Sequence, residues 1–399
     1  MRGSTLATVL VAVFISYLGT PAAVKTGGYK TTDLVVNKSP LIDKNGISHT
    51  GMVDPNLLNP WGVTETPTGS PFWISDNAAG VSTLYNVPAT APNSVTINPL
   101  VVSIPTPVDL LGRSGAPTGT VFNITTLSSK PGFMISGVDA NNKPTMAPAR
   151  FLFATEDGTI VGWNPGVNPE GFTGKGGTFG IIAVDNSGNN FDPNANPKTG
   201  AVYKGLAIAT DANGQTRLYA TNFRSGMVEA YDGNFLAVTS FTDPKLPDSY
   251  APFNIVNING ALFVTFAKQN AEKNADVAGQ GHGIVDVFDL DGTLRQRFAQ
   301  HDQLNSPWGV ALAPTGFGEL GGALWIGNFG NGHINAFDPE SGKFLSKVRD
   351  PKGQAILIDG LWTIRFGSDN GNGGAANTLY FTAGPNGETD GLFGSLNPN

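Results

Sequence analysis

The sequence of 399 residues has no cysteine and few charged residues. Without cysteine, the chain can form no disulfide bond and has no thiol to act as a nucleophile or metal ligand. Charged residues make up only 14% of the chain, and the formal net charge is −7. No basic stripe is therefore available to neutralise the phosphates of a nucleic acid, and we expect no nucleic-acid partner.

Long hydrophobic runs are also missing after the first part of the chain. Met1–Ala23 predicts a secretory signal, because Arg2 precedes the apolar stretch Thr5–Leu18 and small residues follow it. The stretch is shorter than the ~20 residues that a membrane-spanning helix needs. We expect a mature chain without a membrane span, secreted or held in the periplasm or cell envelope, and monomeric.

Glycine and proline are abundant, with 52 and 28 residues, which favours short strands joined by tight turns. The tetrapeptide Pro-Trp-Gly-Val at Pro60–Val63 recurs at Pro307–Val310. Each copy is followed by a predicted strand that contains a tryptophan, Phe72–Ser75 and Leu324–Gly327. Self-similarity of this kind is the sequence signature of a repeat architecture.

Aligned on the first copy, the chain contains six units, each with an inner strand, a second strand, a polar turn and a third strand. The inner strands are predicted to start at Pro60, Pro117, Tyr203, Pro252, Pro307 and Ile358. The second strands are predicted at Phe72–Ser75, Phe151–Thr155, Leu218–Thr221, Leu262–Thr265, Leu324–Gly327 and Leu379–Thr382. Extra length falls in Leu127–Ala149, Asn164–Thr199 and Asn270–Gly281. We predict an all-β fold, a single six-bladed β-propeller over residues 29–396.

The two ends of this region predict how the ring closes. The sixth unit lacks an outer strand, whereas Tyr29–Asn37 is a predicted strand without a unit of its own. The ring closes if this N-terminal strand completes the last blade, which also removes an open sheet edge.

With these units the chain resembles the six-bladed propellers of the NHL-repeat and gluconolactonase type. The Pro-Trp-Gly-Val copies and Trp325–Phe329 (Trp-Ile-Gly-Asn-Phe) also resemble an uncharacterised family of exported bacterial propellers, many of which carry a PEP-CTERM sorting tail. The resemblance covers about Tyr29 to Leu396 and implies the fold while implying little chemistry. Asn397–Asn399 is neither apolar nor basic, so we expect no membrane sorting of that kind.

Two motifs are interpreted as turns. Phe288–Thr293 (Phe-Asp-Leu-Asp-Gly-Thr) matches the nucleophile motif of haloacid-dehalogenase phosphatases, which requires a parallel sheet. Here it aligns with the hairpins at Tyr231–Asn234 and Phe337–Gly342, where Asp and Gly serve turn geometry. The oxygen-rich stretch Asp185–Asp192 lacks the bidentate Glu of an EF-hand.

Four histidines are predicted at one rim of the ring. His49 and His301 precede inner strands and are candidates for proton transfer, while His282 and His333 begin third strands and are candidates for ligand binding. The alternative is that polar loop residues simply gather at any rim.

Two rings of side chains follow from the alignment. The second position of each inner strand gives a ring made of Trp61, Thr118, Lys204, Phe253, Trp308 and Asp359. Among these, the candidates for ligand binding are Trp61, Lys204, Trp308 and Asp359, with Lys204 opposite Asp359 across the axis. Trp61 and Trp308 can instead pack between blades, which is the commoner role of a strand tryptophan.

The second predicted ring lies directly after the second strands and consists of Asp76, Glu156, Asn222, Phe266, Asn328 and Ala383. Hard oxygen donors around a channel suit Ca²⁺, so Asp76, Glu156, Asn222 and Asn328 are candidate calcium ligands. The resemblance to gluconolactonases implies a metal-binding Glu at the start of the first inner strand, and Leu57–Pro60 has none.

Two functions stay open, and with them the question whether the protein is an enzyme. The first is a binding module that offers its rim to an extracellular glycan, peptide or envelope component. The second is a calcium-assisted hydrolase or lyase at the channel mouth. The sequons at Asn37 and Asn123 predict glycosylation only in an organism that glycosylates its exports.

Overall fold

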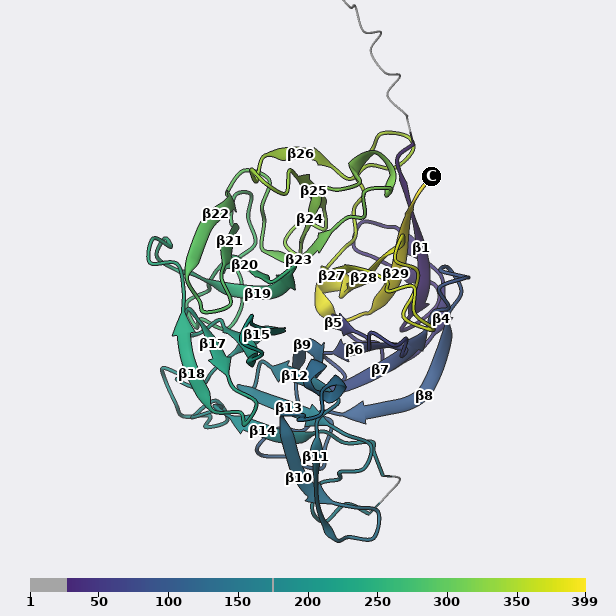
Figure 1. Cartoon of the computed structure of the whole chain (residues 1–399). Helices are drawn as coiled ribbons and strands as arrows, with labels where there is room; N and C mark the ends of the chain where they lie inside the picture. Colours follow the sequence, from purple (N-terminus) through teal and green to yellow (C-terminus); the bar gives the residue numbers. More distant parts are fainter. Residues whose placement is uncertain (1–26, 174–175) are drawn as a thin grey trace, which may run out of the picture.

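The computed structural model describes residues 27–173 and 176–399, which form six blades around a central axis (Figure 1). The predicted signal, Met1–Ala23, lies outside these residues. Helical structure in the described part of the chain is limited to the short turns α1 (Pro385–Glu388), η1 (Ile124–Leu127) and η2 (Gly318–Leu320). No helix among these residues has the length and apolar character to cross a membrane. The predicted all-β six-bladed propeller is confirmed.

Each blade is an antiparallel sheet whose first strand lies at the axis. Blade one holds β5 (Pro60–Thr64), β6 (Phe72–Asp76), β7 (Val81–Asn86) and β8 (Thr96–Ser103). Blade two holds β9 (Pro117–Phe122), β12 (Phe151–Thr155), β13 (Thr159–Trp163) and β14 (Ile181–Asp185). Blade three holds β15 (Tyr203–Thr210), β16 (Thr216–Asn222), β17 (Met227–Tyr231) and β18 (Ala237–Phe241). Blade four holds β19 (Tyr250–Ile258), β20 (Ala261–Lys268), β21 (Ile284–Phe288) and β22 (Leu294–Gln300). Blade five holds β23 (Pro307–Leu312), β24 (Leu324–Asn328), β25 (Ile334–Phe337) and β26 (Phe344–Lys347).

Blade six contains β27 (Leu361–Phe366), β28 (Leu379–Ala383) and β29 (Leu392–Pro398), and the N-terminal strand completes it. Strand β1 (Tyr29–Val36) pairs antiparallel with β29, from Tyr29 opposite Pro398 to Val36 opposite Leu392. The predicted closure is confirmed. The short strand β4 (Met52–Val53) then pairs parallel with β1, and β2 (Leu41–Ile42) forms a small hairpin with β3 (Ser48–His49).

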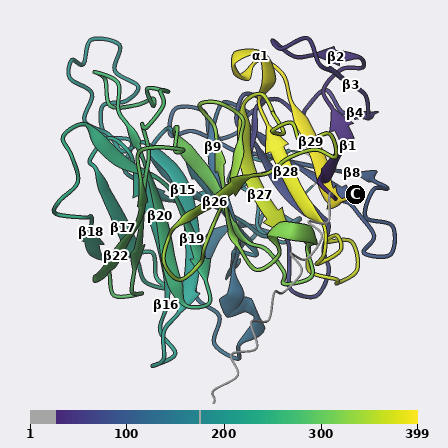
Figure 2. The same ribbon diagram turned by 90° about the horizontal axis from the view of Figure 1, so that it is seen from above.

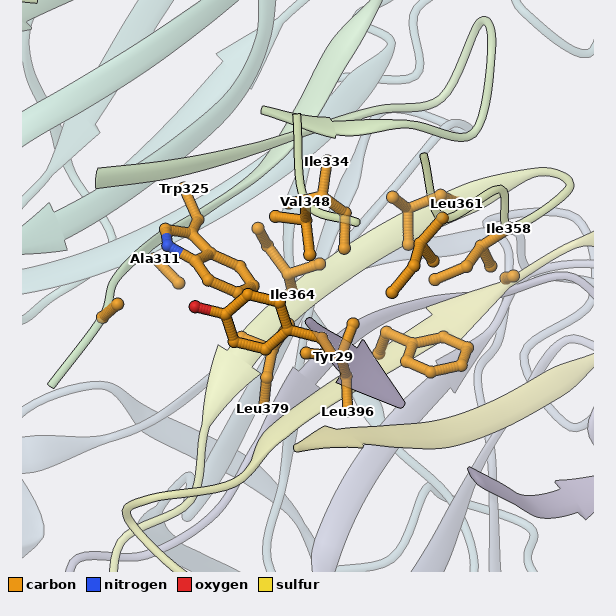
Figure 3. Packing of buried hydrophobic residues seen from close by; sticks show 14 of the residues in the cluster. Tyr29, Ala311, Trp325, Ile334, Val348, Ile358, Leu361, Ile364, Leu379 and Leu396 are labelled. Atoms are coloured by element: carbon orange, nitrogen blue, oxygen red, sulfur yellow. The ribbon is translucent and has the colours of Figure 1, made fainter. Parts of the chain in front are cut away.

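The first residue of the closing strand also joins blade six to blade five. The Tyr29 hydroxyl donates to the Phe317 carbonyl at 3.0 Å, and its ring meets Trp325 edge-on at 5.1 Å between centroids (Figure 3). Both rings are buried in one apolar cluster that spans the two blades. Closure therefore rests on packing as well as on strand pairing.

Glycine at the third position of several inner strands lets neighbouring strands approach closely at the axis. A Cβ atom at Gly62 would lie 2.5 Å from the Thr118 carbonyl oxygen, and one at Gly119 would lie 2.3 Å from the Leu206 amide nitrogen. These distances leave no room for a side chain, which explains the glycine of the repeated tetrapeptide.

The predicted start of the sixth inner strand was wrong by three residues. Leu361 pairs with Ala383 as Pro307 pairs with Asn328, so Trp362 and not Asp359 is equivalent to Trp308. Gly360 resembles the glycine of the repeat but has a φ of 67° and belongs to the connection before the strand.

Blade two carries an insertion within the predicted loop Leu127–Ala149. This segment contains the hairpin of β10 (Met134–Val138) and β11 (Pro144–Pro148), which projects from the ring (Figure 1).

Candidate functional site: the axial mouth

Aromatic side chains close the axis near the end at which the inner strands begin. Trp61, Phe253, Trp308 and Trp362 are buried in one cluster. The Trp362 ring stacks between Trp61, at 3.5 Å between centroids, and Phe329, at 3.9 Å. Trp61 and Trp308 thus have a packing role, and the cluster forms the floor of a polar mouth.

Lys204 lies next to this floor, and its side chain is only 4% exposed. Its Nζ donates to Glu156 Oε1. The ammonium also lies 5.2 Å from the centroid of the Trp61 ring and 5.7 Å from that of Phe223. A carboxylate and two aromatic faces therefore compensate a cation that has lost most of its water.

Three carboxylates from alternate blades interact electrostatically with this lysine. Glu156 follows β12 in blade two, Asp276 lies in the loop after β20 in blade four, and Glu388 ends α1 in blade six. The ammonium of Lys204 acts electrostatically on both Asp276 and Glu388. The polar connections after second strands all lie at one end of a propeller, which is why residues so distant in sequence meet here. Figure 2 shows α1 at the same end as β2 and β3.

Burial raises the pKa of Glu388 to about 7, and the charge of Glu156 adds to this rise, whereas Lys204 opposes it. Burial is also the main cause that raises the pKa of Asp276. Glu388 has a φ of 70° and follows Asn386 and Gly387 in the same left-handed region. Such backbone strain clusters at functional sites.

Amide side chains connect the carboxylates to the aromatic floor. Asn77 Nδ2 donates to Glu156 Oε2 at 2.9 Å. Asn59 Nδ2 donates to Glu388 Oε2 at 3.0 Å, while Asn59 Oδ1 accepts from Trp362 Nε1 at 2.9 Å. We define the mouth as Asn59, Asn77, Glu156, Lys204, Asp276 and Glu388.

The predicted second ring mixes two levels of the structure. Asp76, Asn222 and Asn328 pair with the first residues of their inner strands, Pro60, Tyr203 and Pro307. In blade two that level is held by Thr155, so Glu156 lies one residue further toward the mouth. The residues at the same level as Glu156 are Asn77 in blade one, Phe223 in blade three and Phe329 in blade five.

The predicted calcium ligands do not come together. Asp76 Oδ2 accepts from the Thr83 amide at 2.9 Å, Asn222 Nδ2 donates to Glu229 at 2.7 Å, and Asn328 Nδ2 donates to the Gln303 carbonyl at 2.7 Å. Across residues 27–173 and 176–399, no group of three or more His, Asp or Glu side chains is arranged to hold a metal ion. None of these contacts joins one predicted ligand to another, and calcium binding by this set stays a prediction.

Asp359 does not face Lys204 across the axis, in contrast to the prediction. Its carboxylate pairs with Lys44 at 2.6 Å and accepts from the Asn386 amide at 2.9 Å. The reason is the strand register described above, which gives the axial position in blade six to Trp362.

Each of the four histidines forms its contacts at its own position on the rim. His49 lies between Asp33 and Asp43, with nitrogen–oxygen distances of 3.1 and 3.6 Å. The ring nitrogens of the other three contact backbone carbonyls at 2.8–3.0 Å: His282 at Val277, His301 at Gly281 and His333 at Ile356. None of these contacts joins one histidine to another.

The motifs interpreted as turns have turn geometry. The Asp291 carboxylate accepts from the Thr293 amide at 2.9 Å, between β21 and β22. Asp185 accepts from the Ser187 amide at 3.0 Å.

The sequence held signals for part of the mouth. Leu361–Ile364 (Leu-Trp-Thr-Ile) repeats the pattern of Pro60–Val63, which would have located Trp362. Asn77 directly follows the predicted Asp76. Asp276 and Glu388 lie in connections of unequal length, so an alignment of the strands does not place them at equivalent positions.

The fold and the mouth define a six-bladed propeller with an acidic axial mouth. No family model matches the chain. It is 30% identical over 390 residues to the uncharacterized protein R648 of Acanthamoeba polyphaga mimivirus. The alignment covers 96% of this chain and 83% of that protein. The chain belongs to the same family as that protein.

Among solved structures, the soluble aldose sugar dehydrogenase of Escherichia coli in its apo-form is similar, with a TM-score of 0.50 and 12% identity over 93% of this chain and 100% of that one. A gluconolactonase from Xanthomonas campestris matches with a TM-score of 0.35 and 16% identity over 68% and 88%. At these identities the likeness concerns the fold alone. The resemblance to bacterial propellers with PEP-CTERM tails stays a prediction.

Proposed function

We propose that this chain is an exported binding propeller whose mouth takes a cationic group of an extracellular glycan, peptide or envelope component. The observation that carries the proposal is the set of three carboxylates, Glu156, Asp276 and Glu388, around the single ammonium of Lys204. When all are ionised, two negative charges lack a partner within this set.

Burial is the main cause that raises the pKa values of Asp276 and Glu388, and the charge of Glu156 adds to both rises. In the free protein, protons reduce the negative charge. A primary ammonium from a ligand would favour the ionised carboxylates, so its binding would release protons. Glu156 keeps 29% of its side chain exposed, which leaves the mouth in contact with solvent.

The test is calorimetric titration at pH 7 with the blocked tripeptide acetyl-Gly-Lys-Gly-amide and, as a neutral control, acetyl-Gly-Met-Gly-amide, because blocking removes the terminal ammonium from both peptides. We expect binding of the lysine peptide only, weaker at high salt, with a heat that depends on the buffer because protons are released. Glu388→Gln should weaken binding, whereas Asp291→Asn in a distant hairpin should not. Equal binding of both peptides, or no binding of either, would contradict the proposal.

One observation favours a second candidate, a hydrolase or lyase that acts at the same mouth. A pKa of about 7 suits Glu388 to general acid–base catalysis near neutral pH. In this case Glu388 would move the proton, and Lys204 would stabilise developing negative charge. A pH–rate profile that loses its inflection near neutrality in Glu388→Gln would support this candidate over simple binding.

Calcium is a separate proposal, because it rests on the predicted ligands Asp76, Glu156, Asn222 and Asn328 and not on the charges around Lys204. A chelator that lowers the melting temperature, with recovery on adding calcium, would support a calcium site. An unchanged melting temperature would leave no support for it.

A further inference from the structure

A cavity lies on the axis below the aromatic floor. It has a volume of about 270 Å³ and is lined by residues of all six inner strands. Trp308 and the glycines Gly62, Gly119 and Gly309 line it beside the floor. The remaining lining residues follow these along the strands, so this lower cavity lies toward the face opposite the mouth.

The lower cavity has aliphatic side chains and one ion pair in its wall. Val63, Ile208 and Ile255 are among the apolar lining residues. Arg365 Nη2 donates to Glu65 Oε1 at 2.7 Å, and Nη1 donates to the Val63 carbonyl at 2.9 Å. The Glu65 side chain is 5% exposed and that of Arg365 is 33% exposed.

This ion pair leaves two polar atoms unsatisfied. Glu65 Oε2 and Arg365 Nε are both buried without a hydrogen-bond partner among the residues that the structure describes. The first is an acceptor and the second a donor. Because a buried polar group without a partner is costly, the pair calls for an occupant that can both donate and accept. A hydroxyl group does both.

The pair is also balanced in charge, so a charged ligand would place an uncompensated charge in a mostly aliphatic cavity. At about 30 Å³ per water molecule, the cavity corresponds to about nine waters, or a ligand of about ten non-hydrogen atoms. We propose that the lower cavity binds a small neutral molecule with an apolar body and a hydroxyl group beside the Glu65–Arg365 pair.

The test uses four probes of matched size: benzyl alcohol, toluene, benzoate and benzylamine. Ligand-observed NMR and calorimetric titration should show saturable binding of benzyl alcohol at one site. The other three should bind about tenfold or more weakly, because each lacks the hydroxyl or carries a charge. Equal binding of toluene would mean that the polar pair plays no part, and would overturn the proposal.

Two variants locate the site. Val256→Phe places a ring in the lining of the lower cavity and should reduce benzyl alcohol binding about tenfold or more. Val238→Phe, on the exposed outer strand β18, is the matched control and should leave it unchanged. Persistent binding in folded Val256→Phe would place the alcohol elsewhere.

The double variant Glu65→Leu/Arg365→Met removes the charges and the polar atoms of both side chains together, and so avoids leaving one buried charge alone. It should bind benzyl alcohol and toluene alike. A retained preference for the alcohol would overturn the assigned role of the pair. Folding is checked by circular dichroism. Glu388→Gln should bind benzyl alcohol normally, which separates this proposal from the function proposed for the mouth. Absence of benzyl alcohol binding in the folded wild-type chain would also overturn it.

Discussion

Lys204 is the residue on which the arrangement of the mouth depends. Its side chain is almost fully buried, and its ammonium donates a hydrogen bond to Glu156 and lies over the Trp61 ring. Its positive charge also opposes the rise in pKa that burial causes at Glu388 and Asp276. One side chain thus links the aromatic floor to carboxylates from three blades.

We expect Lys204→Met to lower the free energy of unfolding by about 1–3 kcal/mol, because Glu156 loses its charged partner. The double variant Lys204→Met/Glu156→Gln should recover part of this loss, since no unpaired carboxylate remains. Urea denaturation of the four proteins of the cycle measures the coupling. Additive effects of the two substitutions would show that the pair contributes little.

Asn123, one of the two sequon residues, is fully buried. Its Nδ2 donates to the Ala149 carbonyl at 2.8 Å and to the Gly132 carbonyl at 3.2 Å. A glycan on this nitrogen is incompatible with the fold.

We expect the folded protein from a glycosylating host to carry no glycan at Asn123, as measured by peptide mass spectrometry. Asn123→Ala should lower the free energy of unfolding by about 1–3 kcal/mol, because two buried carbonyls lose their donor. Asn141→Ala, in an exposed turn, serves as the control and should change it by less than about 0.5 kcal/mol.

At the scale of elements, the β2–β3 hairpin is tied to the closing strand by His49. Burial alone would lower the pKa of His49, but the hydrogen bond to Asp33 and the charges of Asp33 and Asp43 outweigh it and raise the pKa above 6.5. A charged His49 therefore connects β3 to β1 through Asp33.

Because the folded pKa of His49 is raised, its contribution to stability is complete below about pH 6.5 and is lost as the pH rises through the folded value. We expect the melting temperature to fall over this range more in the wild type than in His49→Gln. His301→Gln, at an exposed loop position, should keep the wild-type profile. A wild-type profile in His49→Gln would assign the dependence to another group.

The sequence predicted most elements because each strand carries its own pattern. Phe151–Thr155 is a strand with the predicted bounds, and the fifth inner strand starts at Pro307 as predicted. Ile358 was a wrong start because a glycine in a tetrapeptide cannot distinguish a strand from the turn before it. The mouth was harder still, since Asp276 and Glu388 reach the axis through connections whose path depends on tertiary packing.

At the scale of the whole molecule, one strand pairing, β1 with β29, joins the first and last strands of the propeller and closes the ring. Removing residues 27–36 should lower the melting temperature sharply and promote aggregation, because β29 becomes an open edge. Scanning calorimetry and light scattering would measure both effects. A shortened chain that melts like the wild type and stays monodisperse would show that the β1–β29 pairing contributes little to stability.

The same closure has a consequence for how the protein is made. Asn37, just after β1, donates to Asp390, which lies 353 positions further along the chain. At about 5–20 residues per second, a ribosome needs about 20–70 s to supply that partner. During this interval the first strand has no edge to join, and five blades can form before the sixth. Completion of the ring therefore waits until β29 has been synthesised, so β1, the earliest strand of the propeller, finds its partner last.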